Sequence, residues 1–164
     1  MEAGKSKGHF GLRISDCGLR GRDNIIEFWI SDCGLKTVNR KGPLKMNPEV
    51  MKARTKKFSL RVVKMVDSLP RGRASDVMGR QLLRSGTSVA ANYRAACRSR
   101  SSADFINKMS IVEEEADESI FWMELLGESG LITEQRTKDL MIEANELLAI
   151  TVSSINTARK RIKA

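Results

Sequence analysis

Arginines and carboxylates are the residues of this chain whose types and spacing could do chemistry. Arg80, Arg84, Arg94 and Arg98 are separated by four, ten and four residues. In an α-helix, fourteen residues return to within about 40° of the starting direction, so all four could share one stripe. A guanidinium is a planar fork of hydrogen-bond donors that suits phosphate oxygens. The spacing therefore predicts a phosphate-binding surface.

Neighbouring cations could enlarge this surface. Arg100 follows in the next turn, and Lys56 and Lys57 belong to an outer basic cluster. We include all three in the predicted nucleic-acid-binding set. A structural alternative stays open, in which the arginines pair with carboxylates of the next helix or of a neighbouring subunit. Those carboxylates are Glu113, Glu114, Glu115, Asp117 and Glu118.

Two of these carboxylates, Glu115 and Glu118, fall on a helical line with apolar residues, so we expect them to be partly buried. A buried carboxylate needs hydrogen-bond partners or a raised pKa. The available donors on the facing helix are Thr87, Asn92, Tyr93 and Arg94. We interpret Thr87, Asn92, Tyr93, Glu115 and Glu118 as a polar network that fixes helix register or a subunit interface.

The sequence does not indicate an enzyme. After His9 the chain has no histidine, which argues against a di-iron bundle and against Ser/His/Asp or Cys/His nucleophiles in the helical region. No phosphate loop or nucleophile elbow is present. A magnesium site built on Glu115 and Glu118 remains an alternative, and magnesium-dependent nucleic-acid cleavage would reveal it. We expect no catalytic residues, no metal and no cofactor.

Composition and periodicity predict the fold. The chain has 164 residues, 41% hydrophobic and 30% charged, with 5% aromatics and three prolines, which suits one helical domain. Apolar residues recur at helical spacing in four segments. We expect helices from about Pro48 to Ser68, from a Ser75 or Asp76 cap to about Arg98, from a Ser101 cap to about Gly127, and from Thr133 onward. Short connections favour an all-α, antiparallel up-and-down four-helix bundle over residues 46–164.

The apolar stripes of these helices predict the core. The first carries Phe58, Val62, Met65, Val66 and Leu69. The second carries Val77, Leu82, Leu83, Val89, Tyr93 and Cys97, with Gly86 allowing a close helix approach. The third carries Phe105, Met109, Val112, Ala116, Ile120 and Met123. The fourth carries Leu140, Ala144, Leu147, Leu148, Ile155, Ala158 and Ile162.

Residues 1–45 differ from the remainder. The hexapeptide ISDCGL occurs twice, beginning at Ile14 and Ile30, and two copies are too few for a repeat architecture. His9, Cys17 and Cys33 could supply three zinc ligands, but their spacing fits no common zinc module. We expect a disordered extension, or one that arises from an overcalled start codon, with Met46 as the functional start.

Charge is also uneven. The formal net charge is +9. Residues 46–100 hold 13 basic and 3 acidic residues, whereas residues 101–132 hold 1 basic and 8 acidic ones. No stretch approaches the roughly 20 apolar residues of a membrane span, so we expect a cytoplasmic protein with no membrane association.

Three stretches of the chain carry a resemblance to a known family: RSGTSVAANYRAACRSRS, ADFINKMSIVEEEADES and WMELLGESGLI. From about Met46 to the C-terminus the chain resembles the four helix bundle protein family, first noticed in intervening sequences of bacterial large-subunit ribosomal RNA genes. The resemblance implies a ring-shaped homopentamer. A similar bundle serves as the accessory protein of diversity-generating retroelements, where it partners a reverse transcriptase and RNA.

Two functions follow as hypotheses. The first is a non-enzymatic homo-oligomer that binds nucleic acid, most directly structured RNA or an RNA–protein complex, through its arginines. Because aromatics are few, phosphate and shape recognition fits better than base stacking. The alternative is a scaffold that docks a partner enzyme such as a reverse transcriptase, without contacting nucleic acid itself.

Overall fold

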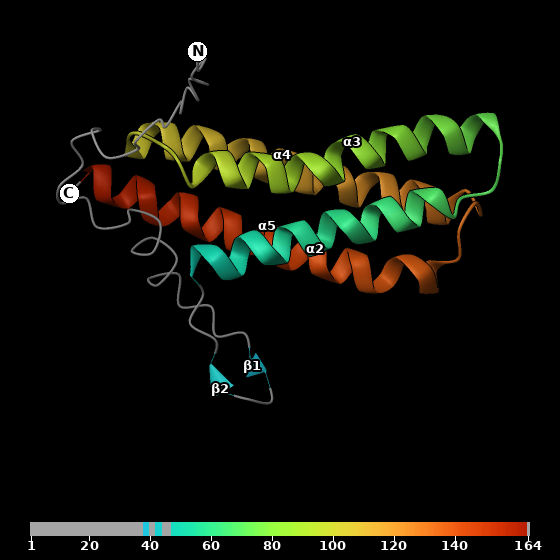
Figure 1. The fold of residues 1–164 in the computed structure, drawn as a ribbon, viewed down its shortest axis with the longest axis horizontal. Coiled ribbons are helices and arrows are strands. Elements are labelled where there is room, and N and C mark those ends of the chain that lie inside the picture. Colours follow the sequence, from blue (N-terminus) through green and yellow to red (C-terminus); the bar gives the residue numbers. More distant parts are fainter. Residues whose placement is uncertain (1–37, 40–41, 44–46, 164) are drawn as a thin grey trace, which may run out of the picture.

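A computed structural model describes residues 38–39, 42–43 and 47–163, and within them four long helices form an antiparallel bundle. The helices are α2 (Pro48–Asp67), α3 (Arg73–Ala96), α4 (Ser102–Glu128) and α5 (Glu134–Lys163). Figure 1 shows them side by side along one long axis, with the C-terminus at the end where α2 begins. The predicted all-α four-helix fold is therefore confirmed.

Two very short strands precede the bundle. β1 (Val38–Asn39) pairs antiparallel with β2 (Gly42–Pro43), with Val38 opposite Pro43. The backbone of this pair makes no close approach to the four described helices. Residues 1–37 lie outside the described residues, so the expectation of a disordered or overcalled extension, and of the zinc-ligand alternative there, stays a prediction.

Caps explain where the helices begin. Asn47 precedes Pro48 and its side-chain oxygen accepts the Val50 N–H at 2.8 Å, which satisfies one of the free donors of the first turn of α2. Ser101 caps α4 as predicted, accepting the Asp104 N–H at 3.1 Å. The Asp104 carboxylate in turn accepts a hydrogen bond from the backbone N–H of Arg100 at 3.0 Å. These contacts position the connection that carries Arg100.

The predicted cap of the second helix is wrong. The first residue of α3 is Arg73, because the Asp76 N–H already bonds to the Gly72 carbonyl at 2.9 Å. Ser75 and Asp76 therefore belong to its first turn instead of preceding it. The same helix ends at Ala96, so Arg98 lies just beyond it, where its N–H bonds to the Ala95 carbonyl.

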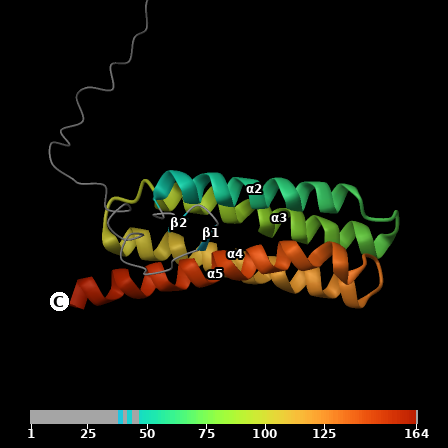
Figure 2. The same cartoon turned by 90° about the horizontal axis from the view of Figure 1, so that it is seen from below.

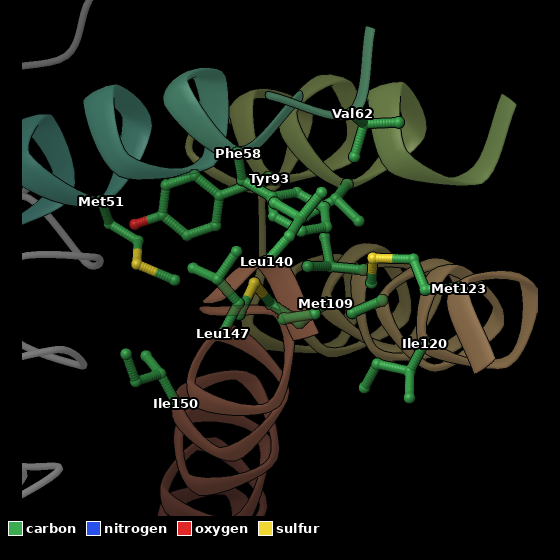
Figure 3. Packing of buried hydrophobic residues seen from close by; sticks show 14 of the residues in the cluster. Met51, Phe58, Val62, Tyr93, Met109, Ile120, Met123, Leu140, Leu147 and Ile150 are labelled. Atoms are coloured by element: carbon green, nitrogen blue, oxygen red, sulfur yellow. The ribbon is translucent and has the colours of Figure 1, made fainter. Parts of the chain in front are cut away.

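The core runs along the bundle axis and follows the predicted stripes with three exceptions. Leu83 is partly buried but lies outside the core, where it lines a surface hollow. Figure 3 shows Phe58 and Met51 of α2 lying with Tyr93 of α3 in this core. Val77 is 46% exposed, because it lies about 140° around the helix from the buried Leu82. Ile162 is 56% exposed, because α5 extends past the other helices at its C-terminal end (Figure 2).

Helices that are adjacent in the sequence make most of the helix contacts, and among the pairs in contact the seam between α2 and α5 is the smallest. One arginine joins this seam. Arg54 of α2 donates from Nε to Glu143 at 2.7 Å and from Nη2 to the same carboxylate at 3.1 Å, and it also pairs with Glu146. All three side chains are part-buried or exposed. The pKa of Arg54 is raised, first by its hydrogen bond to Glu143.

Candidate nucleic-acid interface

The arginines of the predicted stripe do not share one set of partners. Arg84 and Arg94 lie about 40° to either side of the line through Arg80 and Arg98, and ten residues separate them by about 15 Å along the axis. Arg84 leans towards α4, whereas Arg94 and Arg98 lean towards α2. The two sides of the helix therefore meet different partners.

Arg84 forms salt bridges with two carboxylates of α4. Its Nη1 donates to Glu115 at 3.3 Å, and its Nη2 forms a close pair with Glu118 that includes a 2.5 Å contact. The Arg84 side chain is 52% exposed, so the pair stabilises the fold only weakly. For Arg84 the ion-pairing alternative is the geometry in the structure.

Glu115 and Glu118 have opposite environments. Burial raises the pKa of Glu115, and Arg84 opposes that effect. The pKa of Glu118 is lowered by hydrogen bonds from Arg84 and from the Trp122 indole, whose Nε1 donates at 2.9 Å. One carboxylate is thus partly desolvated and the other is stabilised as an anion, although both touch the same guanidinium.

The other members of the predicted polar network bond elsewhere within the described chain. Thr87 donates to the Leu83 carbonyl at 2.7 Å, and Asn92 donates to the Ser88 carbonyl at 3.0 Å, both in their own helix. Tyr93 lies in the core, where its side chain helps to lower the pKa of Cys97. The donors that reach the carboxylates are Arg84 and Trp122. A role for these residues at a subunit interface stays a prediction.

Arg94 and Arg98 meet lysines of α2 at one end of the bundle. A notch of about 320 Å³ lies between the start of α2 and the end of α3. We call this hollow the basic notch. The residues that line it are Glu49, Lys52, Ala53, Lys56, Arg94 and Arg98. Antiparallel packing creates this site, because the first turns of α2 lie beside the last turns of α3 (Figure 1).

The single carboxylate of the basic notch is already used. Glu49 accepts from Lys52 Nζ at 2.7 Å, and this bond raises the pKa of Lys52, while nearby Arg94 lowers it. Among the described residues, no carboxylate forms a salt bridge with Lys56, Arg94 or Arg98. Three unmatched cations around one hollow create a positive potential that an anion would relieve.

Three other predicted residues lie apart from the basic notch. Arg80 lines a separate hollow near Leu69 and Pro70, at the far end of α3. Arg100 is exposed in the α3–α4 connection, and Lys57 is exposed on α2 and lines none of the hollows described here. Sequence reasoning missed Lys52, although its spacing of four residues from Lys56 places both on one helix face.

The free thiol of Cys97 is close enough to Lys52 of the basic notch for each group to shift the pKa of the other. It is partly buried and packs against the core, as predicted. Burial raises the pKa of Cys97, while Lys52, Tyr93 and Arg94 lower it.

Within the part of the chain that the structure describes, no three His, Cys, Asp or Glu side chains gather where they could hold a metal ion. At Glu115 and Glu118, the position that the magnesium alternative requires is occupied by the Arg84 guanidinium.

Glu118 makes the stability of the fold depend on pH in the acid range. The pKa of Glu118 is lower in the folded state than its ordinary value of 4.5. Its contribution to the free energy of unfolding is therefore complete above pH 4.5 and is lost as the pH falls through the pKa of the folded state. We expect Glu118→Gln, which keeps an acceptor for Trp122, to be less stable than wild type near neutral pH. Chemical unfolding should show this difference shrinking in acid. A difference that is constant with pH would contradict the assignment.

Comparisons with known proteins place the bundle in a family. A family model described as 23S rRNA-intervening sequence protein matches residues 49–153. A solved structure from Bacteroides thetaiotaomicron, described as a protein with unknown function from the S23 ribosomal protein family, is 36% identical with a TM-score of 0.63. The match covers 68% of this chain and 99% of that one. Among curated proteins no sequence matches. Among the described helices, none contains an apolar stretch that could span a lipid bilayer.

Proposed function

We propose a function from one premise: the chain belongs to the 23S rRNA-intervening sequence protein family. In this proposal it is a cytoplasmic, non-enzymatic homo-oligomer that contacts structured RNA or an RNA–protein complex. The observation that carries the proposal is the basic notch, where Lys56, Arg94 and Arg98 converge without carboxylate partners among the described residues. Arg80, Arg100 and Lys57 lie outside the basic notch and add to the positive charge of the surface.

The basic notch suits a phosphate backbone better than a base. Its walls contain no aromatic side chain on which a base could stack. Two arginines can each offer a fork of donors to phosphate oxygens, and Lys56 supplies a mobile point charge. Recognition of this kind depends on the spacing of phosphates, which differs between A-form RNA and B-form DNA. We therefore expect shape-dependent binding with little sequence preference.

Binding of the wild-type protein tests this proposal. An RNA hairpin and a DNA duplex are titrated by fluorescence anisotropy over a series of salt concentrations. We expect binding at low salt, with a linear fall in log affinity against log salt of about 0.7–0.9 per phosphate contacted. Absence of binding at low salt would contradict the proposal.

Self-association is the second part of the proposal. On α4, three large apolar side chains are exposed: Ile111 (40%), Phe121 (52%) and Leu125 (36%). Phe121 packs edge-on against Trp122, with ring centroids 4.9 Å apart. Glu115 and Glu118 lie within this surface, which fits their interpretation as interface residues. Symmetry would multiply the basic notch around a ring, and weak contacts would then add.

We expect Phe121→Glu to dissociate the assembly, because it places a charge in a desolvated apolar contact. Sedimentation velocity checks the mass. Leu60→Glu is the matched control, since Leu60 is equally exposed, at 53%, but lies on α2. An assembly that survives Phe121→Glu would exclude this face, and a wild-type protein that is monomeric would refute the homo-oligomer.

The alternative function is a docking scaffold for a partner enzyme such as a reverse transcriptase. The same exposed face of α4 favours it, because large exposed apolar side chains also mark protein-binding sites. Salt separates the two functions. Apolar protein docking survives moderate salt and polyanion competition, whereas phosphate binding does not.

A further inference from the structure

A second surface differs from the basic notch in both charge and position. A groove of about 550 Å³ lies between the last turns of α4 and the first turns of α5, and we call it the acidic groove. It is at the opposite end of the bundle from the start of α2 (Figure 1). The proposed RNA binding uses none of its residues.

Apolar side chains form the interior of the acidic groove. Met123 is fully buried at its base, Met141 is partly buried, and Ile142 is 50% exposed. Gly127 contributes no side chain, and a Cβ there would meet only Glu134 Cγ, at 3.9 Å. The missing side chain keeps the groove open. Methionines are flexible and polarisable, and they suit grooves that accept apolar side chains of varied shape.

Carboxylates surround this interior. Glu124 and Glu128 are four residues apart on α4 and share one face, and Glu134 lies across the groove on α5. Lys138 is the one basic residue among the lining residues. No cation forms a salt bridge with these three glutamates within the described ranges. Such a rim repels the phosphates of nucleic acid and of anionic lipid, so those two classes of ligand do not fit.

We propose that the acidic groove docks a basic amphipathic helix of a partner protein. An apolar side chain of that helix would cover Ile142 and enter above Met123, which removes apolar surface from water. Lysines or arginines on either side would meet Glu124 and Glu128 on one wall and Glu134 on the other. This is helix-in-groove recognition, with apolar anchors at spacings of three and four residues and flanking charges that set orientation.

A pair of synthetic peptides tests the proposal with the full-length protein. One peptide has leucines at helical spacing and lysines elsewhere, and the other has the same composition scrambled so that no apolar face exists. We expect the amphipathic peptide to bind at least about tenfold tighter by fluorescence anisotropy. Equal binding of the two peptides would overturn the proposal, because it would mean that only net charge matters.

Two variants locate the binding. Gly127→Leu fills the acidic groove and Ile142→Glu places a charge inside it. Each should weaken the amphipathic peptide by about tenfold or more. Ala149→Leu, an exposed position two turns beyond Ile142 on the same face of α5 and outside the lining of the groove, is the matched control and should leave affinity within about twofold. Thermal unfolding checks that each variant is folded. If Gly127→Leu does not fold, Ile142→Glu decides the test.

The remaining outcomes are equally informative. RNA affinity should be unchanged in both variants, which separates this proposal from the proposed function. Peptide affinity that is unaffected by both variants would overturn the groove as the docking site. If sedimentation velocity shows that the variants dissociate the protein's own assembly while the peptide does not compete, the groove joins copies of the chain and the partner-helix proposal is wrong.

Discussion

Reversing two charges in the basic notch, with Arg94→Glu and Arg98→Glu together, should weaken RNA binding by about 100-fold or more. A hydrogen bond to a charged partner contributes about 1.5–3 kcal/mol, so the loss of two corresponds to at least about two powers of ten in affinity. The new carboxylates also repel phosphate. Fluorescence anisotropy at one fixed salt concentration measures the change.

Matched controls separate the basic notch from net charge. Lys56→Glu and Lys57→Glu alter adjacent residues identically, but only Lys56 lines the notch. We expect the Lys56 variant to lose several times more affinity. Arg80→Glu provides the same comparison on α3. Equal losses in all variants would show that RNA responds to overall charge, and the notch would then not be the binding site.

The Arg94 and Arg98 variant should remain folded. Both side chains are exposed, and reversing charge at the C-terminal end of α3 opposes the helix dipole by about 0.3–1 kcal/mol per residue. Removing repulsion among the unmatched cations offsets part of this cost. A circular dichroism melt therefore distinguishes lost binding from lost structure.

Gly86→Ala should destabilise the fold by about 1–2 kcal/mol, although alanine favours helix. A Cβ at Gly86 would lie 2.8 Å from both methyls of Val62, which is fully buried on α2. Val62 is stiff because it is β-branched. The Gly86 carbonyl also accepts the Ser59 hydroxyl at 2.7 Å, and separating the helices would stretch that bond. Urea unfolding measures the change.

Gly127→Ala is the control for this prediction. Its Cβ would meet only Glu134 Cγ, at 3.9 Å, so the helix preference for alanine should stabilise the protein by about 0.5–1 kcal/mol. Opposite signs at two helical glycines isolate the steric cause. In a double-mutant cycle, the variant that combines Val62→Ala with Gly86→Ala should be about 1 kcal/mol more stable than the sum of the two single effects predicts. Additive effects, or a stable Gly86 variant, would contradict the close packing of α2 and α3.

Periodicity predicted most of the fold because each helix has to bury an apolar face. The stripe from Phe105 to Met123 is buried in full. Ser101 was also predictable, since a cap depends on local sequence. Three details were not. The start of α3 depends on a backbone bond to Gly72, the exposure of Ile162 depends on the unequal lengths of α2 and α5, and Asn47 was overlooked as a cap.

The site was harder to predict because periodicity gives directions around one helix and says little about its neighbours. It placed Arg84 and Arg94 together, but the packing of α4 and α2 gives them different partners. Likewise, Thr87 and Asn92 satisfy their side chains on their own helix, an option open to any residue of these types. The clasp from Arg54 to Glu143 joins residues 89 apart and becomes visible only in the closed bundle.

The most direct test of RNA binding by the basic notch is the salt dependence of affinity in wild type and in Arg94→Gln with Arg98→Gln. Each phosphate contact contributes about 0.7–0.9 to the slope of log affinity against log salt. If Arg94 and Arg98 each contact a phosphate, the slope of the variant should be shallower by about 1.4–1.8, and its affinity should be lower. An unchanged slope and affinity would show that the notch does not bind RNA.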